Sequence, residues 1–125
     1  MESCPFCNVE KARIVEENSL FFAVRDKYPV TPLHTLLIPF RHVDSYFELS
    51  DDEISAFNSI LHSQRNCIQD LDNEVSGFNV GFNAGRDAGQ TVSHAHVHVI
   101  PRRLNDAKNP EGGVRGVIPK KQNYL

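Results

Sequence analysis

Three histidines alternate with small or branched apolar residues in the segment 93–101. They are His94, His96 and His98, half of the six histidines in the chain. Because side chains of a strand alternate between its two faces, all three rings are expected to share one face. They would lie roughly 7 Å apart, at about 3.3 Å of rise per residue, which suits groups that contact successive parts of one ligand. A solvent-facing polar stripe and a metal site of imidazoles alone are the other interpretations.

A second chemical motif is the pair Cys4 and Cys7, separated by two residues. This spacing is half of a structural zinc site, which needs two further ligands. Two free thiols or a thioredoxin-like redox pair would have the same spacing, but the redox motif requires a following helix, and residues 8–17 have no helical pattern. With Cys67 the chain has three cysteines, which do not make a disulfide framework.

The elements that position these motifs can be predicted from the pattern of apolar residues. Strands are expected at residues 13–17, 20–26, 34–39, 75–82 and 92–100. Residues 28–33 contain two prolines and are expected to form a loop, as is the segment 83–90 with its two glycines. After residue 101 the chain is rich in glycine, asparagine and proline, so residues 103–125 are predicted to be an irregular tail.

One long helix is predicted over residues 50–72. Ser50 and Glu53 have the spacing of a capping box, in which each side chain bonds a free backbone N–H of the other residue. Apolar residues then follow at helical spacing: Ile54, Phe57, Leu61, Ile68 and Leu71. The order of elements indicates an α+β fold, with an antiparallel sheet and the helix packed on one face.

Length and composition limit the possible classes of protein. The chain of 125 residues is expected to be a single domain, and its 40% hydrophobic and 23% charged residues are typical of a globular one. A net charge of −3 argues against a partner that is a nucleic-acid polymer, which requires a basic face. No apolar run approaches the ~20 residues of a membrane span, and the first ten residues lack the pattern of a secretory signal. The sequence therefore predicts a cytoplasmic protein without a membrane partner.

Three segments together resemble the histidine triad (HIT) family. The run SHAHVHVIPR is similar to the family's signature, in which histidine and a bulky apolar residue alternate. Residues 26–34 resemble its D-x-x-P-x-x-P-x-H segment, and residues 83–92 resemble its N-x-G-x-x-A-G-Q-T/S-V loop. The resemblance runs from about residue 20 to 102 and implies a HIT-like α+β fold with a five-stranded antiparallel sheet.

The resemblance also implies roles for individual residues. His96 would attack the α-phosphorus of a nucleotide, His98 would donate a hydrogen bond to a phosphate oxygen, and His34 would lie near the phosphate. The implied substrate contacts are Asp26 for the ribose, Asn83, Gln90 and Thr91 for phosphate oxygens, and Phe22 as an apolar wall for the base. The sequence departs from the family's pattern before His34, where Leu33 replaces the usual glycine.

In the zinc-bearing branch of the family, the first triad histidine and a histidine after the third strand complete the metal site. The resemblance therefore implies a structural zinc ion held by Cys4 and Cys7 of the N-terminal segment 1–10 together with His42 and His94. Four protein ligands would close the coordination sphere, as is typical of structural zinc.

The third triad position bears on the reaction, because the nucleotidyl-transferase branch has glutamine where this chain has His98. The resemblance favours a homodimeric hydrolase of dinucleoside polyphosphates. A hydrolase of adenosine phosphoramidate or aminoacyl-adenylate is the alternative enzyme, and a nucleotide-binding signalling or scaffold module is the alternative outside catalysis. Cations late in the chain are either contacts for a polyphosphate or part of a solvated tail: Arg102, Arg103, Arg115, Lys120 and Lys121.

Overall fold

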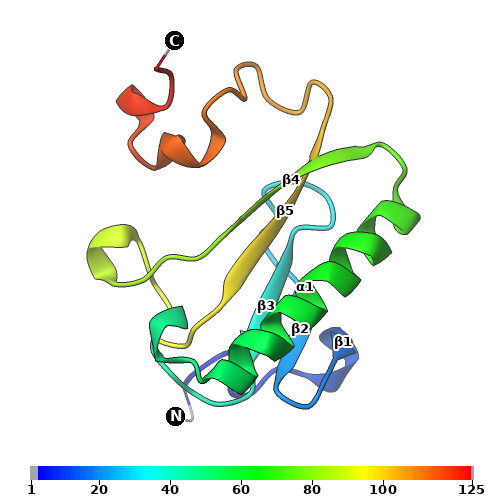
Figure 1. Cartoon of the computed structure of the whole chain (residues 1–125), viewed down its shortest axis with the longest axis vertical. Helices are drawn as coiled ribbons and strands as arrows, with labels where there is room; N and C mark the ends of the chain where they lie inside the picture. Colours follow the sequence, from blue (N-terminus) through cyan, green and yellow to red (C-terminus); the bar gives the residue numbers. More distant parts are fainter. Residues whose placement is uncertain (1–2, 125) are drawn as a thin grey trace.

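Five antiparallel strands and one helix make up the fold, as the sequence predicts (Figure 1). The computed structural model describes residues 3–124, so residues 1, 2 and 125 of the predicted domain lie outside the described residues. The strands are β1 (Ile14–Glu17), β2 (Phe21–Arg25), β3 (Thr35–Pro39), β4 (Val75–Gly81) and β5 (Val97–Arg103), and the helix is α1 (Asp51–Leu71). The strand order in the sheet is β1-β2-β3-β5-β4. The predicted fold class is confirmed.

The helix α1 covers one face of the sheet and forms the larger apolar core with it. Side chains that alternate along β2, β3 and β5 point to this face, and they meet Ile60 and Ile68 of the helix. The buried strand residues of this cluster are Phe21, Ala23, Leu37, Val75, Val97 and Val99. Of the apolar stripe predicted for the helix, Phe57, Leu61 and Ile68 pack in this core, whereas Ile54 and Leu71 are exposed.

The opposite face of the sheet has a smaller apolar cluster. Phe22, Val24, Leu36 and Ile38 are buried there, and the segment before β1 covers them with Phe6, Val9 and Ile14. Leu36 of β3 is the cross-strand partner of His98 of β5. Because directly opposed residues of neighbouring strands share a face, His98 lies on this side, away from α1.

A buried polar network explains why the apolar stripe of the helix is interrupted at Gln64. This side chain is 1% exposed. Its amide donates to Glu16 Oε1 at 2.6 Å and accepts from Arg25 at 2.7 Å, and Arg25 also donates to Thr35 Oγ1 at 2.7 Å. The buried amide thus has both a donor and an acceptor partner, which removes the cost of its desolvation.

The strand that carries His98 begins and ends later than predicted. The pattern predicts residues 92–100, whereas β5 spans Val97–Arg103. Before Val97 the chain pairs with a loop, because Ala95 N donates to the Val43 carbonyl at 2.8 Å. At the other end β4 continues to pair with β5 as far as Arg103. Of the three histidines only His98 lies within the strand.

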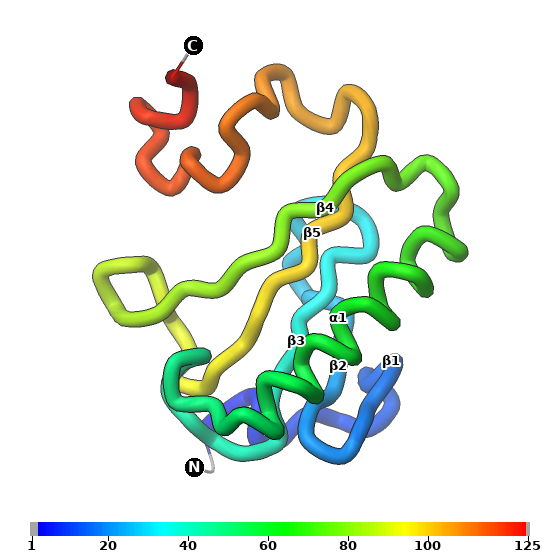
Figure 2. Tube along the Cα trace, in the orientation of Figure 1, coloured from blue at the N-terminus to red at the C-terminus, as the bar shows by residue number. Residues whose placement is uncertain are grey.

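Short 3-10 helices account for most of the remaining regular structure. They are Lys11–Arg13, Tyr46–Glu48, Arg86–Ala88, Gly113–Val117 and Pro119–Lys121. The last two lie in the segment predicted to be an irregular tail, so that prediction is corrected for these residues, and Figure 2 shows this segment at the far end of the molecule from the N-terminus. Among residues 3–124, no helix is long and apolar enough to cross a bilayer.

The N-terminus of α1 is fixed by the predicted capping box. Ser50 Oγ accepts from Glu53 N at 3.2 Å, and Ser50 N donates to Glu53 Oε1 at 2.8 Å. The Glu53 carboxylate also accepts two bonds from Arg41, at 2.7 and 3.1 Å. Glu53 therefore joins the start of the helix to the loop after β3.

Replacement of Glu53 tests this connection. The hydrogen bonds from Arg41 lower the pKa of Glu53 to about 2. The folded pKa is below the unfolded one, so the ionised group stabilises the fold above about pH 4.5, and this contribution is lost as the pH falls through about 2. We expect Glu53→Gln to lower the free energy of unfolding by about 1.5–3 kcal/mol at neutral pH.

Urea denaturation at neutral and acid pH measures this difference. The Glu53→Gln protein should lose less stability on acidification than the unsubstituted chain. Asp52→Asn is the matched control, because Asp52 is an exposed carboxylate in the same helical turn. A Glu53→Gln protein as stable as the Asp52→Asn protein at neutral pH would contradict the role of the Arg41 contact.

Candidate active site and metal site

A cavity of about 680 Å³ opens on the face of the sheet opposite α1. The N-terminal segment, the loop before β3, the loop after β4 and the histidine segment form its walls. Six of the predicted site residues line it: Asp26, His34, Asn83, Thr91, His96 and His98. Two of the predicted substrate contacts, Gln90 and Phe22, do not.

A backbone bond orients the ring of His96. Its Nδ1 lies 2.8 Å from the His94 carbonyl oxygen. A carbonyl can only accept, so the ring proton of neutral His96 lies on Nδ1. The other nitrogen, Nε2, then has a free lone pair, which is what a nucleophile at this position requires.

His34 and His98 form a hydrogen-bonded pair, and a backbone bond to His34 determines where the ring proton of each lies. Val30 N donates to His34 Nδ1 at 3.0 Å, so the proton of His34 lies on Nε2. His34 Nε2 is 2.9 Å from His98 Nδ1 and 3.4 Å from Asp26 Oδ2. His98 Nδ1 is therefore an acceptor, and the proton of His98 lies on Nε2. His98 therefore lines the cavity as a hydrogen-bond donor, next to His96, whose Nε2 has a free lone pair.

Burial keeps this pair neutral. It lowers the pKa of His34, although Asp26 opposes the change. Burial also lowers the pKa of His98 to about 4, with further contributions from His96 and His34. Asp26, His34 and His98 also lie close enough to hold a cation. The Val30 bond argues against this use, because a metal at His34 Nε2 would need the lone pair where the proton lies.

The turn before His34 has a left-handed residue, although glycine is absent there. Leu33 has φ of 70°, a conformation that disfavours residues with a Cβ. Its carbonyl accepts from Thr35 Oγ1 at 2.7 Å, and its side chain packs against the larger core. The replacement of glycine by Leu33 therefore leaves the turn intact, and His34 N bonds the Thr31 carbonyl at 3.1 Å.

The side chain of Gln90 makes three hydrogen bonds to the backbone. Its amide nitrogen donates to the carbonyls of Asp44 and Val92, at 2.6 and 3.0 Å, and its oxygen accepts from Gly85 N at 2.9 Å. The amide thus holds the loop between β4 and β5 against the loop after β3.

Phe22 is 3% exposed and packs in the smaller apolar cluster, where Phe40 contacts its ring. The apolar residues that line the cavity include Phe6, Val9 and Leu36, which were not predicted as site residues. Alternation along β3 puts Leu36 beside His98. The position of Phe6 could have been inferred from its place between the two cysteines, because a metal ion bound there would bring Phe6 close to the histidines.

Three of the five late cations that were considered as polyphosphate contacts interact with other side chains of the protein. Arg102 bonds Asp106 and Asn79, Arg103 bonds Asp72, and Arg115 stacks on Tyr124. Arg102 and Arg103 thus bond side chains near the end of β5, and Arg115 contacts another residue of the tail. The cations that line the cavity are Arg13 and Lys27.

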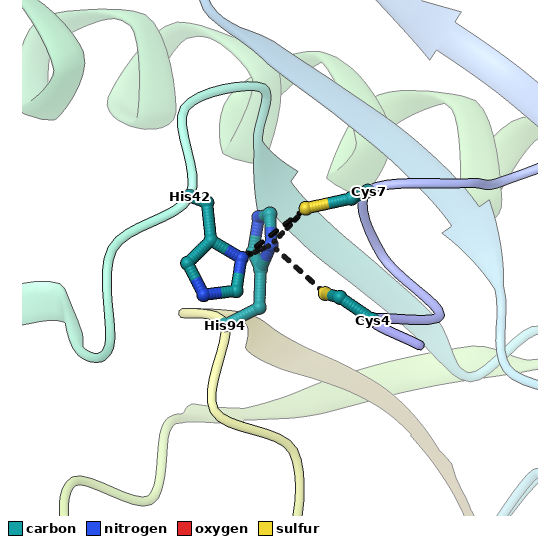
Figure 3. Close-up of side chains that lie close together, drawn as sticks. All are labelled: Cys4, Cys7, His42 and His94. Carbon is teal, nitrogen blue, oxygen red and sulfur yellow. Dashed lines mark hydrogen bonds between the residues drawn. The ribbon is translucent and has the colours of Figure 1, made fainter. Parts of the chain in front are cut away.

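The four predicted metal ligands converge beside the cavity (Figure 3). His94 Nδ1 lies 3.5 Å from Cys4 Sγ, 3.6 Å from Cys7 Sγ and 3.1 Å from His42 Nδ1, and Cys7 Sγ lies 3.2 Å from His42 Nδ1. A tetrahedral zinc ion, with Zn–S of about 2.3 Å and Zn–N of about 2.0–2.1 Å, requires ligand separations of about 3.3–3.8 Å. The donor set fits zinc: the separations of 3.5 and 3.6 Å lie in this range, and those of 3.1 and 3.2 Å lie just below it.

The proton of His94 is also in the position that a metal ligand requires. His94 Nε2 lies 2.9 Å from the Pro39 carbonyl oxygen, so its proton is on Nε2 and its Nδ1 lone pair points to the cysteines. Burial lowers the pKa of His94, which favours the neutral ring. His42 lies shortly after β3 and next to Arg41, whose guanidinium donates to the Glu53 carboxylate.

Known proteins are similar to this chain over most of its length. The HIT domain matches residues 8–105. The AP-4-A phosphorylase of Mycobacterium tuberculosis is 34% identical over 82% of this chain and 53% of its own length. The structure of a Zn-bound histidine triad family protein from Mycobacterium smegmatis has a TM-score of 0.75 and 29% identity, over 86% of this chain and 81% of that one. Plasmodium falciparum diadenosine triphosphate hydrolase, in complex with cyclomarin A, has a TM-score of 0.74 and 28% identity, over 81% of this chain and 68% of that one.

The fixed protons can be tested by nitrogen-15 NMR of the imidazole rings. We expect neutral His98 to carry its proton on Nε2, and we expect His34→Ala to allow both tautomers because the donor to His98 Nδ1 is lost. His34→Gln should restore the Nε2 form if its amide donates to the same atom. His62→Ala is the control, since His62 is exposed on α1. A His98 proton on Nδ1 in the unsubstituted protein would rule out the hydrogen-bonded pair.

Proposed function

Because this chain belongs to the HIT domain family, we propose that it is a nucleotide hydrolase that cleaves dinucleoside polyphosphates at an α-phosphate. The reaction would proceed through a nucleotidyl-histidine intermediate. The observation that carries the proposal is the pair of adjacent rings with opposite functions. His96 offers a lone pair at Nε2 and His98 offers a proton at Nε2, with ring centroids 5.3 Å apart.

The cavity has groups that suit each part of a nucleotide. The Asp26 carboxylate would accept from the ribose hydroxyls, and Phe6, Val9 and Leu36 would contact the base. Asn83, Thr91 and His98 would bond phosphate oxygens. Arg13 and Lys27 supply positive charge at the cavity wall. Gln90 acts indirectly, because its amide holds the loop that carries Thr91.

The proposed chemistry has two displacements at one phosphorus atom. In the first, the His96 Nε2 lone pair forms an N–P bond as the bond to the leaving polyphosphate breaks, and the Nδ1 proton of the cationic ring is held by the His94 carbonyl. In the second, water forms the new P–O bond, the N–P bond breaks and neutral His96 is recovered. One proton of the water stays on an oxygen of the product phosphate, and the other is released to solvent. His98 Nε2–H stabilises the charge on the phosphate oxygens in both steps.

The fixed proton of His98 favours a polyphosphate as leaving group. A polyphosphate departs as an anion and needs only a hydrogen bond. An amine leaving group, as in a phosphoramidate, needs a full proton, and neutral His98 would have to become an anion to supply it. Protonation of His98 at Nδ1 is opposed by the His34 bond and by the burial that lowers the pKa of His98 to about 4.

The relatives support this substrate class. One bears the name of a phosphorylase of AP-4-A and another is a diadenosine triphosphate hydrolase. Both names refer to dinucleoside polyphosphates, but the acceptor differs: inorganic phosphate in a phosphorylase and water in a hydrolase. His98 at the third triad position favours water here.

We also propose a homodimer, for which β4, an outer strand with exposed Val80, offers an edge. Light scattering would measure twice the mass of one chain.

Cleavage of diadenosine tetraphosphate and adenosine phosphoramidate, side by side, tests the function. We expect faster AMP release from the dinucleotide, with ATP as the second product and no ADP when inorganic phosphate is added. His96→Ala should lower kcat by more than about a thousandfold, since the nucleophile is lost. His62→Ala is the control.

Three results would each count against the proposal. Faster release from the phosphoramidate would favour the alternative enzyme. Formation of ADP in phosphate would indicate a phosphorylase. Binding of nucleotide without turnover of either compound would favour a signalling or scaffold module.

We propose that the metal site holds one structural zinc ion, because four protein ligands leave no position open for a substrate. Metal analysis of untagged protein should give one zinc ion per chain. Cys7→Ser should lose the ion, whereas Cys67→Ser should keep it, because Cys67 lies on α1, outside the group of ligands. Protein without zinc after purification in its presence would contradict the four-ligand site.

A further inference from the structure

Phe6 lies between the two cysteines of the metal site and also lines the cavity. Its ring centroid is 4.9 Å from that of His96 and 6.0 Å from that of His94, and both contacts are edge-to-face. Phe6 also packs on the smaller apolar cluster of the sheet. One side chain therefore contacts the proposed nucleophile, a metal ligand and the space for the nucleotide.

The position of Phe6 depends on side-chain contacts. Residues 3–9 form turns and irregular backbone, and the first 3-10 helix begins at Lys11. Cys4 and Cys7 bring this segment to His94 and His42, at 3.5 and 3.2 Å. Thiols are weak hydrogen-bond donors, so these contacts hold the segment much less firmly than bonds to a metal ion would.

We propose that Phe6 is a positioning residue of the nucleotide cavity and that zinc holds it there, so that zinc and nucleotide strengthen each other's binding. The inference rests on the proposed function, since it takes the ligand of the cavity to be a nucleotide. Phe6 provides an apolar wall for the nucleoside and an edge that limits rotation of the His96 ring. With zinc bound, the wall is in place before the nucleotide arrives, and its ordering cost does not reduce the nucleotide's affinity.

Thermodynamic linkage makes this proposal quantitative. If zinc raises the affinity for a nucleotide by some factor, the nucleotide raises the affinity for zinc by the same factor. Couplings between sites are typically about 5- to 150-fold. The same number can therefore be measured twice, by independent methods that do not depend on turnover.

The first measurement is the Kd of AMP, by calorimetry, for the zinc-loaded and the zinc-free protein. We expect AMP to bind at least about fivefold more weakly without zinc. The second is the rate at which zinc passes to a chelator, which saturating AMP should slow. Equal AMP affinity in both forms, with circular dichroism showing that the zinc-free form is folded, would overturn the proposal. Failure of AMP to bind the zinc-loaded protein would overturn both this inference and the proposed function.

Variants of Phe6 keep the test decisive if the zinc-free protein unfolds. Zinc-loaded Phe6→Ala should bind AMP more weakly, and AMP should no longer slow its release of zinc, whereas Phe6→Leu should keep part of both effects. Phe47→Ala is the control, because Phe47 is 78% exposed and lies outside the cavity. AMP affinity and zinc release in Phe6→Ala equal to those of Phe47→Ala would overturn the proposal. If AMP binding and the coupling hold but no dinucleotide is cleaved, only the proposed reaction fails.

Discussion

Four of the five histidines of the two sites, His34, His94, His96 and His98, each have one nitrogen bonded to a backbone group or to another of the four, and this bond determines where the ring proton lies. The Pro39 carbonyl leaves His94 with a lone pair toward the cysteines, and the His94 carbonyl leaves His96 with one at Nε2. The Val30 amide has the opposite effect on His34, which then makes His98 a donor. One type of side chain thus supplies a metal ligand, a lone pair and a proton.

The two faces of the sheet carry different parts of the protein, one the larger core and the other the cavity. The face covered by α1 is apolar apart from the network around Gln64, and it contains the larger core. The segment before β1 covers part of the other face, which also carries the cavity. The two sites meet at His94 and His96, because His94 of the Cys–His cluster also supplies the carbonyl that orients His96. Glu53 links this region to the helix through Arg41, next to His42 of the same cluster.

The parts of the structure that depend on local pattern were predictable from the sequence. The capping box located the start of α1, and alternation along the strand correctly put His98 on the opposite face from Val97 and Val99. The start of β5 was not predictable, because pairing of Ala95 with Val43 depends on a loop distant in sequence. The same holds for Gln90, whose partners lie on two loops, and for the proton positions, which depend on single backbone groups. Phe22 lies within a predicted strand and Phe6 between the two cysteines, and only the three-dimensional packing shows that Phe6 rather than Phe22 lines the cavity.

The wall of the cavity made by residues 5–10 lies outside the sheet, whereas the histidines lie on or beside strands that also form the core. Substitutions at the wall residues outside the smaller apolar cluster and the metal site, Pro5, Asn8 and Glu10, therefore leave the contacts of the core in place. A mutation at one of these positions can modify which ligand fits, while the reacting groups and the fold are retained. The fold thus has positions at which a substitution alters the cavity alone and others at which it alters the core. New ligand preferences can arise in such a protein by single steps, each of which leaves a folded molecule.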